Sequence, residues 1–167
     1  QCRRRKSIRS AFFRPQGEWL EPRLLLATFA VNATNDASDA DPNDGVCDSD
    51  LETSGQQCTL RAAIMQANAL AGDDEILLPA GTYNLSLPGA GEDAATTGDL
   101  DLLDNLAIRG DSAATTIIDA QNLDRVFDVV GSVVVDISGV TIRQGSAAEG
   151  GGLYNAGGSA ATLTNAI

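Results

Sequence analysis

The most informative absences from this sequence are histidine, abundant aromatic side chains and long apolar runs. The lack of histidine removes the side chain that most often serves as a general base or as a metal ligand near neutral pH. Aromatic residues make up only 4% of the 167 residues, so the composition favours a core of stacked Val, Ile and Leu. No apolar run approaches the roughly 20 residues that cross a bilayer, and we expect no transmembrane segment.

Positive charge is also scarce, and it is unevenly distributed. The chain has 11 basic and 23 acidic residues, for a net charge of −12. Residues 1–27 hold seven of the basic and two of the acidic residues, whereas residues 28–167 hold four basic and 21 acidic ones. A body this acidic repels phosphate backbones, so we expect no nucleic-acid partner. The basic head is instead typical of the start of an export signal.

The segment that ends the basic head carries a short recognisable motif. It reads Leu20-Glu21-Pro22-Arg23-Leu24-Leu25-Leu26 and resembles the LEPR-x-LL motif near the N-terminus of large exported bacterial proteins. The resemblance implies an extracellular or cell-surface destination. We therefore expect residues 1–27 to be an export leader that is disordered or removed, the alternative being a short amphipathic start to the domain.

An acidic stretch follows a predicted strand over residues 28–34. Its oxygen-bearing side chains fall at nearly alternate positions before a turn-forming glycine, in the order Asp39, Asp41, Asn43, Asp44 and Gly45. This spacing approximates a calcium loop, although the glycine comes one position later than in an EF-hand and no Glu stands at the twelfth position. Two interpretations stay open, a calcium site at these residues and a solvated acidic loop. Calcium is the one cofactor that the sequence suggests.

Cys47 and Cys58 bracket a polar loop. In an exported protein two cysteines this close usually pair, and the closed loop is worth on the order of 3 kcal/mol of chain entropy. A zinc site would need further ligands, and the sequence has no histidine to supply them. We therefore expect a disulfide between Cys47 and Cys58.

Residues 59–70 show the periodicity of a helix. Apolar side chains recur at i, i+3, i+4 and i+7, with Thr59 as the candidate N-cap and Gly72 just past the end. These apolar residues are Leu60, Ala63, Ile64 and Ala67.

This helix also carries a family resemblance. Cys58-Thr59-Leu60-Arg61-Ala62-Ala63-Ile64, with Ala67-Asn68, is similar to the CSLREA motif, which has Ser at position 59 and Glu at position 62. The similarity continues on both sides, from Phe29 through Gly45-Val46-Cys47, Ile76–Tyr83, Gly98–Leu102 and Leu123–Phe127. The CSLREA family begins large bacterial surface proteins and passes into pectate-lyase-like β-helix repeats, so the resemblance implies that fold. It implies no catalytic residues.

Residues 76–167 consist of short apolar segments separated by Gly, Asn, Asp and Ser turns. Ile137-Ser138-Gly139-Val140 and Leu163-Thr164-Asn165-Ala166 look equivalent at a spacing of 26 residues, near the length of one coil. We predict an all-β fold, the first coils of a truncated right-handed parallel β-helix, with a β-sandwich as the alternative. The residues expected inside are Ile117, Val126, Val135, Val140 and Ile142.

A solenoid needs a cap over the apolar interior of its terminal coil. The predicted helix stands directly before the first coil and has one apolar face. We expect residues 28–75 to form this capping region, with Leu60, Ile64 and Ala67 buried near Ile76 and Leu78. On this model Arg61 and Gln66 face away or form hydrogen bonds at the rim.

Two groups of charged residues are candidates for carbohydrate chemistry. Alternation places Asp99 and Asp101 on one face of a strand, opposite Leu100 and Leu102, and paired carboxylates are what glycoside hydrolysis requires. Polar residues are also normal on the outside of coils and at turns, and we favour that interpretation. The first group is Asp99, Asp101 and Asp104, and the second is Asp119, Asp124, Arg125 and Asp128.

Two functions follow from these observations. The preferred one is the non-catalytic N-terminal region of an exported surface protein, structural or adhesive, with surface polysaccharide or envelope components as partners. The alternative is the N-terminal part of a polysaccharide-degrading enzyme whose active site lies further along the chain.

Overall fold

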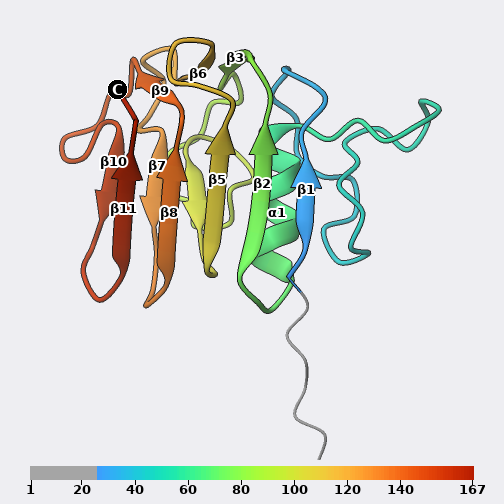
Figure 1. Cartoon of the computed structure of the whole chain (residues 1–167), viewed down its shortest axis with the longest axis horizontal. Helices are drawn as coiled ribbons and strands as arrows, with labels where there is room; N and C mark the ends of the chain where they lie inside the picture. Colours follow the sequence, from blue (N-terminus) through green and yellow to red (C-terminus); the bar gives the residue numbers. More distant parts are fainter. Residues whose placement is uncertain (1–25) are drawn as a thin grey trace, which may run out of the picture.

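The computed structural model describes residues 26–167, so the predicted export leader lies almost entirely outside the described residues. Over this range the chain forms one α-helix and eleven β-strands (Figure 1). The helix α1 spans Leu60–Ala69. The strands are β1 (Thr28–Ala30), β2 (Asp74–Leu78), β3 (Gly81–Asn84), β4 (Leu100–Leu102), β5 (Leu106–Gly110), β6 (Thr116–Asp119), β7 (Phe127–Val129), β8 (Val134–Ser138), β9 (Thr141–Arg143), β10 (Leu153–Asn155) and β11 (Ala160–Thr164).

The strands form three separate parallel sheets. Their orders are β1-β2-β5-β8-β11, β10-β7-β4 and β3-β6-β9. From β2 onward the chain visits the three sheets in turn, and each strand from β2 to β8 pairs with the strand three positions further along. The prediction of a mostly-β fold is confirmed. The β-sandwich alternative is wrong, because every strand pair in the described residues is parallel.

Stacked aliphatic side chains fill the space between the sheets. Ile76, Ile108 and Ile137 are direct neighbours in register across β2, β5 and β8, and all three are fully buried. A second ladder aligns Leu100 with Phe127 across β4 and β7. Burial of apolar surface stabilises a fold by about 25 cal/mol per Å². The buried ladders therefore favour this parallel register over a shifted one.

Of the residues expected inside, Val126, Val135 and Val140 are buried, and Ile142 is partly buried against the core. The prediction for Ile117 is wrong, because Ile118 is the buried member of the pair. Because Ile117 and Ile118 are both apolar and adjacent, the sequence pattern does not tell which of them faces the core. The register of β6 with β3 decides the outcome, since it aligns Ile118 with the buried Tyr83.

The helix α1 lies beside β2 at the β1 end of the strand stack and packs against β2 and β4 (Figure 1). Thr59 caps it, its hydroxyl accepting a hydrogen bond from the Ala62 amide at 3.0 Å. Leu60, Ile64 and Ala67 are buried, at 2%, 0% and 2% exposure. The helix is too short and too little apolar to cross a membrane.

Arg61 and Gln66 form hydrogen bonds, as expected, but not at a rim. Both side chains are buried, because loops before and after α1 cover them. Gln66 donates to the carbonyl oxygens of Asp41 and Val46 in the preceding loop. Arg61 contacts both that loop and the loop of residues 85–99. The helix is therefore enclosed on more than its apolar face.

Candidate functional site

The disulfide joins the two cysteines that the sequence analysis paired. Cys47 and Cys58 are bonded, with Cα atoms 5.0 Å apart, and both are buried. Between them, the Asp48 carboxylate accepts hydrogen bonds from the amides of Asp50 and Gln57. The bond fastens this loop to the residue that precedes the Thr59 cap of α1.

The predicted calcium ligands lie in the loop that precedes Cys47. Their carboxylates accept hydrogen bonds from nearby backbone amides: Asp39 from Asp41 and Asp48, Asp41 from Asn43, and Asp44 from Val46. Burial raises the pKa of the Asp39 carboxyl, against the lowering effect of its two backbone donors. These turn-type hydrogen bonds account for the acidic residues locally. Calcium binding at Asp39, Asp41, Asn43 and Asp44 stays a prediction.

The structure brings the two predicted groups of charged residues together into one acidic cluster, made of Asp99, Asp101 and Asp128. One carboxylate oxygen from each residue lies within 4.8 Å of the other two. The cause is the register of the β4–β7 pair, in which Asp101 and Asp128 are direct neighbours. Leu100 and Leu102 point into the core, so Asp101 projects from the opposite face of the sheet.

Arg125, two residues before β7, reaches across this cluster. Its Nε lies 3.1 Å from Asp99 Oδ2, and its Nη1 donates to Asp128 Oδ2 at 2.9 Å. The guanidinium carbon also lies 4.7 Å from the ring centre of Tyr154, the β10 neighbour of Asp128 in register. Cation–π contact and two carboxylates together hold the Arg125 side chain in one position.

The acidic cluster is largely covered by the loop of residues 85–99. Asp101 is fully buried, and its Oδ2 accepts a hydrogen bond from the Ala95 amide at 2.7 Å. Ala95 has a φ of 55°, a conformation that non-glycine residues seldom adopt, and this directs its amide toward Asp101. The second oxygen of Asp101, Oδ1, is buried without a hydrogen-bond partner.

Burial changes the proton affinity of the cluster. Burial, followed by the charge of Asp124, raises the pKa of Asp99 to about 6. Burial also raises the pKa of Asp101 to about 7; the Ala95 amide opposes this, and the neighbouring charge of Asp99 adds to it. The pKa of Asp128 is raised by burial and lowered in part by Arg125. Three carboxylates in close contact therefore need protons or a cation near neutral pH.

Three of the predicted aspartates stay outside this cluster. The Asp124 carboxylate accepts a hydrogen bond from the Arg125 amide. Asp119 forms an ion pair with Arg143 at 2.7 Å on the β6–β9 sheet. Asp104 accepts a hydrogen bond from the Asn105 amide in a turn. Asp119 and Asp104 fit the interpretation of polar residues at turns and on outer faces.

Arg61 is a structural centre that the sequence analysis missed. All five of its N–H groups donate: two to the Asp36 carboxylate and three to the carbonyl oxygens of Ala95, Gly98 and Asp99. The ion pair is closed from solvent, with side-chain exposures of 0% for Arg61 and 1% for Asp36. Its position inside the CSLREA-like motif was the one available signal. Arg61 holds the loop that covers the acidic cluster.

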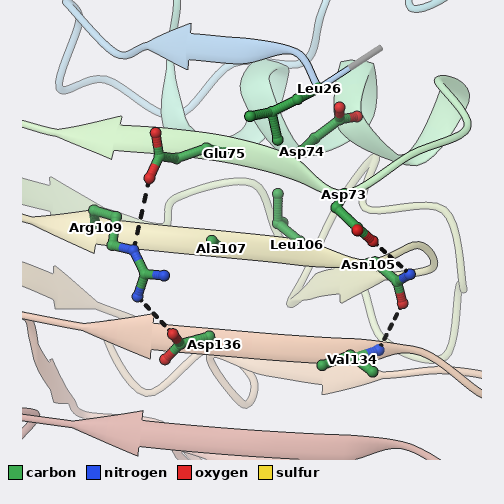
Figure 2. A pocket seen from close by; sticks show the side chains of 10 residues that line it. All are labelled: Leu26, Asp73, Asp74, Glu75, Asn105, Leu106, Ala107, Arg109, Val134 and Asp136. Atoms are coloured by element: carbon green, nitrogen blue, oxygen red, sulfur yellow. Dashed lines mark hydrogen bonds and ion pairs between the residues drawn. The ribbon is translucent and has the colours of Figure 1, made fainter. Parts of the chain in front are cut away.

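A groove runs along the outer face of the first sheet, across β2, β5 and β8 (Figure 2). It encloses about 450 Å³. Arg109 spans it, with its Nη1 at 2.7 Å from Asp136 and its Nε at 3.7 Å from Glu75. At one end, Asn105 donates to Asp73 and accepts from the Val134 amide (Figure 2). Polar groups in fixed positions beside apolar surface are suited to binding a hydroxyl-rich ligand.

Comparisons of the chain with protein-family models, with curated proteins and with solved structures found no match. The CSLREA resemblance therefore stays a prediction.

Proposed function

We propose that residues 76–167 are the first coils of a right-handed parallel β-helix and that residues 28–75 close its end. Support comes from three parallel sheets that the chain visits in turn, with in-register aliphatic ladders between them. The right-handed sense follows from the strong preference of parallel crossover connections. Burial of Leu60 and Ile64 beside β2 and β4 supports a capping role for α1.

The function that this fold supports best is that of a non-catalytic, structural or adhesive N-terminal region of an exported surface protein. The observation that carries the proposal is the repeated return of the chain to the same parallel sheets, because such stacks serve as extended stalks and recognition faces. The disulfide between Cys47 and Cys58 supports an oxidising destination. The LEPR-x-LL-like and CSLREA-like motifs support the same destination.

A surface polysaccharide is the proposed partner, and the groove between Glu75 and Asp136 is its proposed contact. Arg109, Asn105 and Asp73 offer hydrogen-bond donors and acceptors there, as sugar hydroxyls require. The enzymatic alternative is not favoured, because the paired carboxylates Asp99 and Asp101 are buried. In glycoside hydrolysis one carboxyl group must protonate the glycosidic oxygen while the other acts on the sugar carbon or on a water, so both must be reachable by the substrate.

Surface labelling of the organism that makes the protein tests the destination. Antibodies raised against the folded chain should label intact, non-permeabilised cells, and labelling seen solely after permeabilisation would contradict export.

A glycan array tests the proposed polysaccharide partner. Binding of a polysaccharide should be weakened by Arg109→Met and retained in Arg143→Met, which removes a paired arginine from a different sheet. Equal binding by both variants would show that the polysaccharide contacts the protein outside the groove.

A further inference from the structure

The acidic cluster of Asp99, Asp101 and Asp128 has the dimensions of a site for one cation. One oxygen from each carboxylate lies within 4.8 Å of the other two. Calcium binds protein oxygens at about 2.3–2.6 Å, so two ligands on opposite sides of the ion are about 4.6–5.2 Å apart. A single calcium ion can therefore contact all three carboxylates without moving the strands apart.

The charge of the cluster is not balanced by the protein. Three ionised carboxylates carry three negative charges, and Arg125, paired with Asp99 and Asp128, supplies one positive charge. Asp101 and Asp128 are also direct neighbours on adjacent strands, an arrangement in which like charges destabilise a sheet. At least two negative charges therefore remain, and the carboxylate of Asp124 beside Asp99 adds to this excess, which a divalent cation would reduce.

A second and independent observation comes from the hydrogen bonding of Asp101. This side chain is fully buried, its Oδ2 accepts from Ala95, and its Oδ1 has no partner. A buried acceptor without a partner has lost its hydration without compensation, and the cost is larger when the group is charged. A bound cation would satisfy this oxygen and remove the cost.

We propose that the acidic cluster binds one calcium ion, which fastens the loop of residues 85–99 to the outer face of the β4–β7 pair. The donor set is made of carboxylate oxygens, which suits a hard cation. Calcium fits better than magnesium, because magnesium demands near-ideal octahedral geometry, whereas calcium accepts an irregular set of six to eight oxygen ligands. Water can complete this set beside Asp128, whose side chain is 17% exposed. The role is structural: the ion joins Asp101 of β4 and Asp128 of β7 to Asp99 at the end of the loop.

Calcium titration of the chelator-treated chain tests this proposal. Isothermal titration should give one site, and thermal unfolding should shift upward by about 5–10 °C at a free calcium concentration about 100 times the Kd. Magnesium at the same concentration should produce a smaller shift. Absence of both binding heat and a thermal shift at millimolar calcium would overturn the proposal.

Two variants locate the ion. Asp128→Asn removes one ligand, and it should lower the calcium affinity at least about tenfold. Even the loss of a residue that only orients a metal ligand lowers metal affinity by about 10–100-fold. Asp136→Asn is the matched control: it also changes a strand aspartate that is paired with an arginine, here Arg109, and it should leave the affinity unchanged. If Asp128→Asn binds as wild type does, the ion lies elsewhere, for example in the loop of residues 39–45, and the proposal fails.

Terbium luminescence gives a readout that does not depend on the stability of a ligand variant. Terbium replaces calcium in oxygen sites, and a tyrosine near the site sensitises its emission. Tyr154, which stacks on Arg125, should be the sensitiser. Tyr154→Phe should abolish most of the tyrosine-excited emission while retaining calcium binding, whereas Tyr83→Phe, changed in the core, should not. Equal emission from both variants would place the ion away from the cluster.

Discussion

Arg61 connects three segments of the chain that are far apart in sequence. It joins α1 to Asp36 in the preceding loop and to the carbonyls of Ala95, Gly98 and Asp99 in the loop before β4. Asp36 extends the connection by accepting hydrogen bonds from the amides of Ser86 and Leu87. Because one planar guanidinium satisfies every one of these groups, a shorter or less branched cation cannot replace it.

Arg61→Met should therefore destabilise the protein strongly. The substitution keeps much of the aliphatic volume but leaves the buried Asp36 charge unpaired, which costs about 3–5 kcal/mol. Arg109→Met provides the comparison, because that arginine also pairs with carboxylates but is 38% exposed, and its loss should cost no more than about 1 kcal/mol. Urea unfolding of both variants measures the difference. Similar losses would mean that the Arg61 pair contributes little.

Asp101 gives the metal-free protein a pH dependence of unusual sign. Its pKa and that of Asp99 are raised in the folded state, to about 7 and about 6, so the folded protein binds protons more tightly than the unfolded chain. The stabilising contribution of these two carboxyl groups to the free energy of unfolding is complete below pH 4, and it is lost as the pH rises through 6 and 7. With chelator present, the wild type should thus lose a few kcal/mol relative to Asp101→Asn between pH 5 and pH 8.

This comparison is made by measuring the free energy of unfolding of both proteins at each pH. Subtracting the Asp101→Asn values removes the contributions of other carboxylates, such as Glu92, whose pKa is lowered by hydrogen bonds from Thr97 and its neighbours despite partial burial. Parallel pH profiles for the two proteins would show that Asp101 is ionised throughout this range.

At the scale of elements, periodicity predicted which segments form strands and helix, but not what covers them. The alternation over residues 99–102 places Asp101 opposite Leu100 and Leu102, as predicted. The expectation of a solvent-facing Asp101 failed, because the loop of residues 85–99 folds over that face. Arg61 and Gln66 were misplaced for the same reason. Coverage by a distant loop depends on long-range contacts that leave no local periodicity.

A substitution in α1 tests directly whether the helix is part of the folded core. Ile64 is fully buried on the face of α1 that packs against β2 and β4. Ile64→Ala should lower the free energy of unfolding by about 2–5 kcal/mol through lost burial and a new cavity. Val134→Ala, at a site that is 60% exposed on β8, should change it by about 0.5 kcal/mol at most. A small effect at Ile64 would mean that α1 is not part of the folded core.

At the scale of the whole molecule, the two ends of the strand stack differ. At one end the helix α1 packs against β2 and β4, and its Leu60 and Ile64 are buried. At the other end, β11 continues the inward ladder of Ile76, Ile108 and Ile137 with Leu163, which is 47% exposed. In the described part of the chain no strand pairs with the outer edge of β11. An open strand edge beside exposed apolar side chains favours association with another strand.

The 167-residue chain should accordingly associate through β11 as its concentration rises. Leu163→Lys places a charge on the inward ladder at the open end, where a second chain would have to bury it, and should shift the protein toward the monomer. Val134→Lys makes the same chemical change at an outward position of β8 and should leave association unaltered. Sedimentation velocity over a range of concentrations measures both. If Val134→Lys dissociates the protein and Leu163→Lys does not, the contact lies on the outer face of the first sheet; a wild type that stays monomeric throughout would mean that the β11 end is protected by its own residues.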